Sequence, residues 1–120
     1  MTWTYKVTEA EFHHNGSFQF KARYAGARGY YNDSAKECVK NKGPLPRGKY
    51  RIEAPRQSRA GNYALPLTPD SSNNMCGRNA FMIHGDKNSD LGGASEGCII
   101  LDLLYRKKIW ESKDRELIVE

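Results

Sequence analysis

Alternation between apolar and polar residues is the clearest pattern near the N-terminus. The segment 17–24, SFQFKARY, places its apolar residues on one face and Ser, Gln, Lys and Arg on the other. The segment 3–12 before it, WTYKVTEAEF, is rich in aromatic and β-branched residues, and Asn15-Gly16 lies between the two. An Asn-Gly pair between such segments is typical of a tight β-turn. We therefore expect a hairpin whose inner face carries Phe18, Phe20, Ala22 and Tyr24.

Further short apolar stretches predict strands along the rest of the chain. They are Lys49–Ile52, Tyr63–Leu67, Ala80–Ile83, Ile99–Leu101 and Glu116–Val119. Pro66 cannot donate a hydrogen bond to a neighbouring strand, so its strand is expected at a sheet edge. The segments 55–64 and 68–79 between them are expected to be loops, the first exposed and basic.

Helical signals are few. A short helix is possible over Ser34–Lys40, with Asp33 or Ser34 as its cap. Asp102–Glu111 predicts a second helix. Its apolar stripe is expected to hold Ile100, Leu103, Leu104 and Trp110, with Arg106, Lys107 and Glu111 facing outward. Together these patterns predict one mostly β domain over residues 1–120, with one or two short helices.

Charge adds a possible partner class but does not select one. The net charge is +5, and residues 21–60 carry eleven Lys and Arg against three Asp and Glu. A basic half favours an anionic partner such as nucleic acid, an acidic cell-wall polymer or a membrane surface, or it is simply a solvated face. The basic residues are scattered and form no nucleic-acid motif, so nucleic-acid binding is not expected. No stretch is long and apolar enough to span a bilayer, and no secretory signal peptide is expected.

Cysteine and histidine supply the candidate chemistry. His84 and Cys98 lie fourteen residues apart across a loop of Gly, Asp, Asn and Ser. A histidine can activate a cysteine thiol as a nucleophile, although both residues could equally be ordinary buried residues. Ser95 could orient the imidazole or a substrate carbonyl. Backbone N–H groups of Gly97 and Cys98 could stabilise an oxyanion.

The other cysteines and histidines suggest no second site. Three cysteines allow at most one disulfide, and Cys38–Cys76 is the possible pair if Cys98 is reactive. His13 and His14 are adjacent, so they point to opposite faces of a strand and have no partner at metal-ligand spacing. No metal and no cofactor are expected.

Two motifs in order give the chain a family resemblance. His84-Gly85 followed by Ser95-x-Gly97-Cys98-Ile99 resembles the signature of the L,D-transpeptidase (YkuD-like) catalytic domain. Upstream, Pro46-x-Gly48-x-Tyr50-x-Ile52 is similar to a second segment of that family. The resemblance implies an L,D-transpeptidase-like β-sandwich or barrel.

A smaller group resembles the chain over most of its length. It consists of type VI secretion effectors with an L,D-transpeptidase-like domain, which attack peptidoglycan in a rival bacterium. The shared segments are Trp3-Thr4-Tyr5, Gly43-Pro44-Leu45-Pro46, Asn74-Met75-x-Gly77-Arg78, Phe81-x-Ile83-His84-Gly85-Asp86 and Ser95-Glu96-Gly97-Cys98-Ile99-Ile100. One position departs from the larger family, which usually has Arg where this chain has Ile100.

The resemblance implies a cysteine L,D-carboxypeptidase or L,D-transpeptidase. Cys98 would attack the peptidoglycan tetrapeptide stem at the bond between diaminopimelate and D-alanine, with His84 as acid and base. Arg78, Gly85, Asp86 and Arg106 are the candidate substrate-binding residues, and either arginine could replace the charge missing at Ile100.

The resemblance also implies partners and a place of action. The protein would be made in the cytoplasm, secreted with type VI components, act as a monomeric toxin in the target periplasm, and be blocked by an immunity protein. Two alternatives stay open: a weakly catalytic peptidoglycan-binding module of the same fold, and a basic intracellular interaction protein in which His84 and Cys98 are structural.

Overall fold

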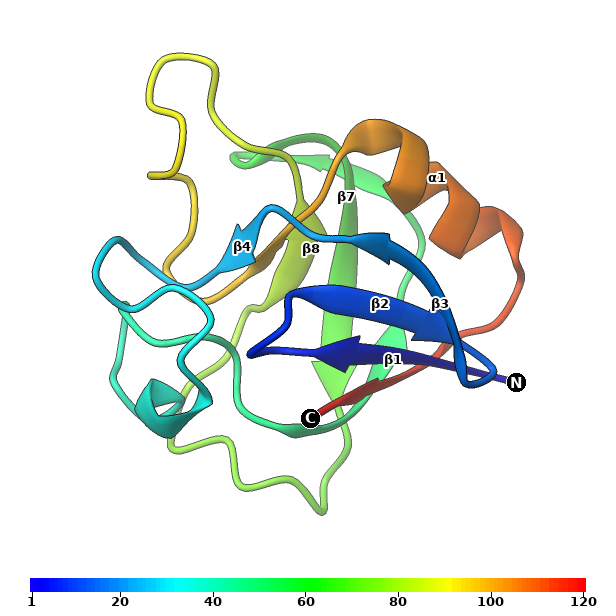
Figure 1. Ribbon diagram of the computed structural model, residues 1–120, viewed down its shortest axis with the longest axis horizontal. Coiled ribbons are helices and arrows are strands. Elements are labelled where there is room, and N and C mark those ends of the chain that lie inside the picture. The colour runs from blue at the N-terminus through cyan, green and yellow to red at the C-terminus, as the bar shows by residue number, and fades with distance from the viewer.

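The computed structural model describes residues 1–120, and its strands form one continuous path of pairings (Figure 1). The path runs β3-β2-β1-β10-β5-β7-β8-β9-β4, and β6 pairs separately with β7. The strands are β1 (Thr2–Lys6), β2 (Glu11–His14), β3 (Ser17–Lys21), β4 (Tyr24–Ala25), β5 (Gly48–Ile52), β6 (Arg56–Ser58), β7 (Gly61–Pro69), β8 (Met82–His84), β9 (Ile99–Ile100) and β10 (Glu116–Val119). The helices are a single 3-10 turn (Ser34–Lys36) and α1 (Leu103–Glu111). The predicted mostly β fold with short helices is confirmed.

The long strand β7 joins two halves of the fold. Its last residues pair with β5, and Leu65 and Pro66 pair with β8. In Figure 1, β1 and β2 cross in front of β7, so the two halves face each other. The core lies between them, with Tyr5 and Phe12 on one side and Ile83 on the other, all fully buried. This packing gives β8 and β9, which carry the candidate site, a rigid base.

The predicted hairpin forms about Asn15-Gly16 as β2 and β3, but one residue of its expected inner face is wrong. Phe12 pairs with Phe20, whereas His13 pairs with Phe18, so β3 has one additional residue at this step. Such a β-bulge moves the following side chain to the other face. Phe18 is therefore 53% exposed and lies edge-on to the His13 ring, while Phe20 is buried.

The expected edge position of Pro66 is also wrong. β7 lies between β5 and β8, so Pro66 is in an interior strand. The Pro66 carbonyl accepts a hydrogen bond from the Glu53 N–H, and Glu53 lies just beyond the end of β5. Proline has no N–H to donate in return, and this missing bond therefore falls outside the regular pairing of β5 with β7. The basic segment expected as a loop over 55–64 instead forms β6 and the start of β7, paired across a short turn.

The helix expected over Asp102–Glu111 forms as α1 (Leu103–Glu111), but its expected apolar stripe is wrong at Leu103 and Leu104. Leu104 is 61% exposed and Leu103 is also exposed, whereas Ile109 and Arg106 are buried. The apolar residues of the segment were not a reliable guide because a buried arginine occupies the inner face. The helix expected over 34–40 is shorter, a 3-10 turn capped by the Asp33 side chain. Neither helix has the length and apolar character needed to cross a bilayer.

Candidate active site

Parallel pairing of β8 with β9 brings His84 and Cys98 to the same face of the sheet. Ile83 pairs with Ile99 and His84 with Ile100. Because side chains alternate along a strand, Met82, His84, Cys98 and Ile100 point to one side, while Ile83 and Ile99 point into the core. The expected arrangement, in which two core segments fix the ends of a loop, is therefore present.

Cys98 has a free thiol in a partly buried position. The Met82 N–H donates a hydrogen bond to its Sγ at 3.3 Å. The pKa of the thiol is raised to about 11, chiefly by burial and also by the Glu96 carboxylate, while the Met82 N–H and the Arg78 charge act to lower it. The resting thiol is therefore protonated at neutral pH.

His84 is prepared to act as a base. Its imidazole is 4% exposed, and Nδ1 lies 2.8 Å from the Gly85 carbonyl oxygen. A carbonyl only accepts, so Nδ1 carries the proton and Nε2 has the free lone pair. Burial lowers the pKa of the imidazole, and the nearby Arg106 charge lowers it further. No hydrogen bond joins this ring to Cys98 in the free protein.

The Ser95 hydroxyl is committed to the backbone, which corrects its expected role. It donates to the Cys98 carbonyl at 2.7 Å and accepts from the Gly97 and Gly26 N–H groups. These three bonds use its hydrogen and both lone pairs. Ser95 therefore shapes the turn before the nucleophile and is not free to orient His84 or a substrate carbonyl.

The same bonds decide which backbone group can receive an oxyanion. The Gly97 N–H donates to Ser95 Oγ, so its expected oxyanion role is wrong for this conformation. The Cys98 N–H makes no hydrogen bond. Gly97 itself has a φ of +142°, and a side chain at this position would meet the Arg78 guanidinium at 2.6 Å. Only glycine fits here, and the Cys98 N–H is the donor that remains.

Arg78 is a buried clamp behind the nucleophile. It is 7% exposed, and its two η nitrogens donate to the carbonyls of Glu37, Gly43, Pro44 and Glu96. All four η hydrogens are thereby used. The expected binding of a substrate carboxylate by this fork is therefore not available, but its charge still acts on Cys98.

Arg106 is likewise turned inward, contrary to the outward position expected for it on the helix. Its Nε donates to the Tyr63 carbonyl at 3.1 Å, and Nη1 donates to the Leu101 carbonyl. It lies beneath Gly85, where a side chain would meet Nη1 at 2.9 Å. Gly85 therefore allows the strand containing His84 to pack on Arg106.

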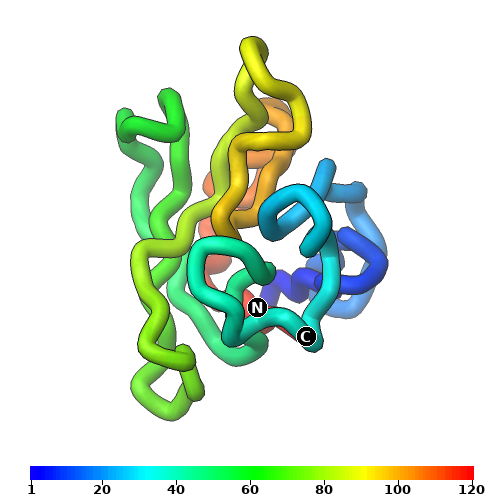
Figure 2. The backbone as a smooth tube through the Cα atoms, turned by 90° about the vertical axis from the view of Figure 1, so that its left-hand side faces the viewer, coloured from blue at the N-terminus to red at the C-terminus, as the bar shows by residue number.

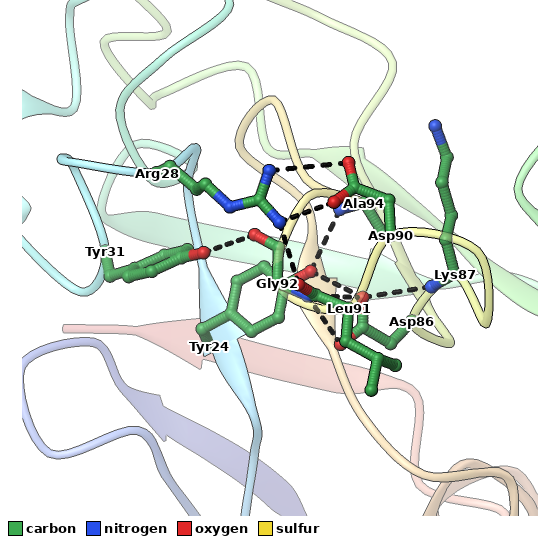
Figure 3. Close-up of polar contacts among 9 residues, drawn as sticks. All are labelled: Tyr24, Arg28, Tyr31, Asp86, Lys87, Asp90, Leu91, Gly92 and Ala94. Carbon is green, nitrogen blue, oxygen red and sulfur yellow. Dashed lines mark hydrogen bonds and ion pairs between the residues drawn. The ribbon is translucent and has the colours of Figure 1, made fainter.

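Asp86 organises the loop between His84 and Cys98 (Figure 3). Its carboxylate accepts from the Tyr24 hydroxyl at 2.7 Å and from the Lys87 and Gly92 N–H groups. The Tyr24 oxygen in turn accepts from the Ala94 N–H. Asp86 therefore has a structural use that accounts for its place in the motif, and the loop is held rather than free.

A cavity of about 360 Å³ opens onto Cys98. It is lined by Lys40, Asn41, Gly77, Arg78, Asn79, Ala80, Phe81, Glu96 and Cys98. A disulfide joins Cys38 to Cys76, as the cysteine count allowed, and so ties together the two segments that form its wall. Figure 2 shows the segment near residue 40 beside the turn that leads to Cys98.

Of the nine lining residues, the sequence reasoning named only Arg78 and Cys98 as site residues, and the charged residues that it missed are Lys40 and Glu96. Glu96 was visible as the variable position of the Ser-x-Gly-Cys motif, so its side chain beside the nucleophile could have been considered. Lys40 gave no local indication, because the disulfide and the Arg78 clamp bring its loop to the cavity.

Comparison with known proteins agrees with this geometry. A sequence profile of the Tlde1 domain matches residues 19–116. The chain belongs to the Tlde1 domain family. This Tlde1 domain is L,D-transpeptidase-like and of the type VI effector class. A comparison with curated proteins finds no match.

Three solved structures share the fold of this Tlde1 domain. They are the L,D-transpeptidase LdtMt1 in complex with imipenem (TM-score 0.56, 13% identity), an L,D-transpeptidase from Stackebrandtia nassauensis (0.53, 16%) and an L,D-transpeptidase from Xylanimonas cellulosilytica (0.56, 13%). Each similarity covers 99% of this chain but only 58%, 54% and 59% of the respective solved chain. The Tlde1 domain thus has the L,D-transpeptidase-like fold in a little over half the length of those chains.

Proposed function

We propose that residues 1–120 form a single peptidoglycan-modifying cysteine enzyme, an L,D-carboxypeptidase and L,D-transpeptidase. The observation that carries this proposal is the free Cys98 thiol at the cavity, on the same sheet face as a His84 ring whose Nε2 is unprotonated. The Tlde1 family and the L,D-transpeptidase fold support the substrate class.

The first half of the reaction forms a thioester. His84 Nε2 takes the thiol proton as Cys98 Sγ attacks the carbonyl carbon at the L-centre of diaminopimelate in a tetrapeptide stem. The Cys98 N–H stabilises the oxyanion that develops. When the tetrahedral intermediate collapses, the bond to D-alanine breaks, and His84 returns the proton to the leaving amine.

The second half depends on what attacks the thioester. Water gives a carboxylate and completes L,D-carboxypeptidase action. A free D-amino acid gives an exchanged stem, and the amine of a second stem gives a 3–3 crosslink. In each case Cys98 leaves as the thiol. Removal or exchange of D-alanine deprives a cell of crosslinking donors, which suits a secreted toxin acting in the target periplasm with an immunity protein as its inhibitor.

Turnover of a defined substrate tests the proposal. Purified protein incubated with disaccharide-tetrapeptide is expected to release alanine, seen by mass spectrometry, and Cys98→Ala is expected to release none. His84→Ala is expected to lower the rate by about 100-fold or more, the usual contribution of a general base. A wild-type protein without turnover, with or without added D-amino acids, would exclude the enzyme.

A binding module of the same fold is the second candidate. The neutral Cys98 thiol and the missing hydrogen bond to His84 are the observations that favour it. Calorimetry with Cys98→Ala and the same tetrapeptide distinguishes the two. Binding together with an inactive wild type would support the module.

A further inference from the structure

Two opposite charges without ion-pair partners line the Cys98 cavity. Lys40 and Glu96 both contribute to its wall, and both are exposed. Neither side chain takes part in a salt bridge, although the chain forms eight others. Asn41 and Asn79 also line this cavity. Besides Arg78, whose η hydrogens are used by backbone carbonyls, the lining therefore contains one cation, one anion and two amide residues.

Glu96 is held by its backbone and free at its side chain. Its carbonyl accepts from Arg78 Nη2 at 2.9 Å, while its carboxylate has no hydrogen-bond partner. The Ser95 and Gly97 bonds fix the residues on either side of it. The backbone of Glu96 is thus fixed two residues from the nucleophile, and its carboxylate is free to meet a ligand.

In the absence of substrate, a carboxylate near Cys98 opposes the deprotonation of its thiol. A negative charge near Cys98 Sγ disfavours the thiolate. A cationic group bound to the carboxylate would cancel that effect. The arrangement therefore suits a substrate that brings its own positive charge to the cavity.

We propose that Glu96 and Lys40 are specificity-determining residues that receive a zwitterionic amino-acid end on the substrate side chain, with the ammonium on Glu96 and the carboxylate on Lys40. This inference rests on the proposed function. In diaminopimelate the D-centre carries both groups, three methylene groups from the L-centre whose carbonyl carbon Cys98 attacks. Binding of the ammonium also makes the Cys98 proton easier for His84 to remove, so the correct substrate promotes its own reaction.

Chemically modified substrates give the test. With wild type as reference, Glu96→Gln is expected to lower kcat/KM for the diaminopimelate tetrapeptide by about 10- to 100-fold, the value of a charged hydrogen bond. The same change should have little effect when the side-chain amine is acetylated. Lys40→Met should show the same pattern between the free and the amidated side-chain carboxyl.

A second measurement separates recognition from simple structural damage. In the free protein, Glu96→Gln should increase the alkylation rate of Cys98, whereas it lowers turnover of the tetrapeptide. Loss of structure would not produce these opposite changes on one variant. The matched control is Glu111→Gln, an exposed glutamate on α1 without an ion pair, which should change neither rate.

The outcomes distinguish this inference from the proposed function. If wild type turns over the tetrapeptide and Glu96→Gln and Lys40→Met act equally on free and modified substrates, the zwitterion inference is overturned and the enzyme remains. If wild type is inactive, binding of the tetrapeptide to Cys98→Ala decides. Weaker binding after adding Glu96→Gln, but not Glu111→Gln, would support the inference, and unchanged binding would overturn it.

Discussion

At the scale of single residues, the polar groups around Cys98 divide into those used by the fold and those left free. Hydrogen bonds to backbone atoms occupy the side chains of Ser95, Arg78 and Arg106. The free groups are the Cys98 N–H, the His84 Nε2 and the Glu96 carboxylate. These free groups are available to bind or react with substrate. The motif residues therefore have two roles: some take part in the reaction, and the others hold the backbone around it.

The raised thiol pKa predicts the reactivity of Cys98. An acid with a pKa of about 11 has about one thiolate in ten thousand molecules at pH 7. Alkylation by iodoacetamide is expected to be slow at neutral pH and to rise about tenfold per pH unit until pH 11. Mass spectrometry of the Cys98 peptide across pH 6–12 measures this profile.

The control for that profile is the unfolded protein in denaturant, where Cys98 should follow an ordinary thiol with a midpoint of about 8.5. A folded protein whose rate levels off at or below that midpoint would contradict the buried, neutral thiol. Such a result would instead indicate a thiolate already paired with His84.

The sequence predicted the reactive pair but not the inward role of its neighbours. His84 and Cys98 could be chosen because thiol and imidazole chemistry is evident from residue type. The partners of Arg78 and Arg106 could not be predicted from the sequence. They are backbone carbonyls in segments distant in the sequence, such as those of Gly43 and Tyr63. Which carbonyls lack partners is decided only when the chain is folded.

At the scale of elements, the loop between β8 and β9 is held by the segment around β4. Arg28 pairs with Asp90 at 2.5 Å and donates to the Leu91 carbonyl, and the Tyr31 hydroxyl donates to the Gly92 carbonyl (Figure 3). Tyr24 and Asp86 connect the base of the loop to β4. These contacts hold the loop in one conformation beside the site at Asp86 and from Asp90 to Gly92.

Tyr24→Phe is expected to loosen this loop. The change removes the bond to Asp86 and the acceptor for the Ala94 N–H, and each lost bond costs about 1 kcal/mol. Amide hydrogen exchange of Gly92 and Ala94 should accelerate, while exchange in β1 should not change. Tyr30→Phe is the control, because the Tyr30 hydroxyl makes no hydrogen bond. Equal protection of the Ala94 amide from hydrogen exchange in both variants would contradict a role of Tyr24 in holding the loop.

The local sequence pattern predicted whether a segment is a helix or a strand better than it predicted which neighbours the element has and which of its residues are buried. The hairpin at Asn15-Gly16, the strand at 116–119 and the helix at 103–111 follow from residues close in sequence. The bulge that turns Phe18 outward and the interior position of Pro66 do not, because both depend on register between strands. Register is set by pairing with segments that the local pattern does not contain.

At the scale of the whole molecule, the Cys38–Cys76 disulfide ties together segments that no shared strand connects. It closes a loop of 38 residues beside the cavity. Its reduction is expected to destabilise the fold by about 4 kcal/mol, through the entropy that the unfolded chain regains. For a chain of this size that loss lowers Tm by roughly 15 °C.

Thermal unfolding with and without dithiothreitol measures this effect. The double variant Cys38→Ser with Cys76→Ser should start at the lower Tm and show no further response to reductant. Cys98→Ala should retain the full response, because its thiol lies outside the bridge. An unchanged Tm in wild type, after thiol counting has confirmed reduction, would contradict a stabilising disulfide.

The position of β10 has a consequence for protein synthesis. β10 lies between β1 and β5, parallel to the first and antiparallel to the second (Figure 1). On the ribosome, the N-terminal hairpin therefore emerges long before the strand that connects it to the rest of the sheet. A nascent chain that already contains β1 and β5 but ends before residue 116 exposes one unpaired edge on each of these strands, and such edges are liable to pair wrongly with other chains. Completion of the sheet thus waits for residues translated after Cys98, and a chaperone that covers β1 and β5 would act in that interval.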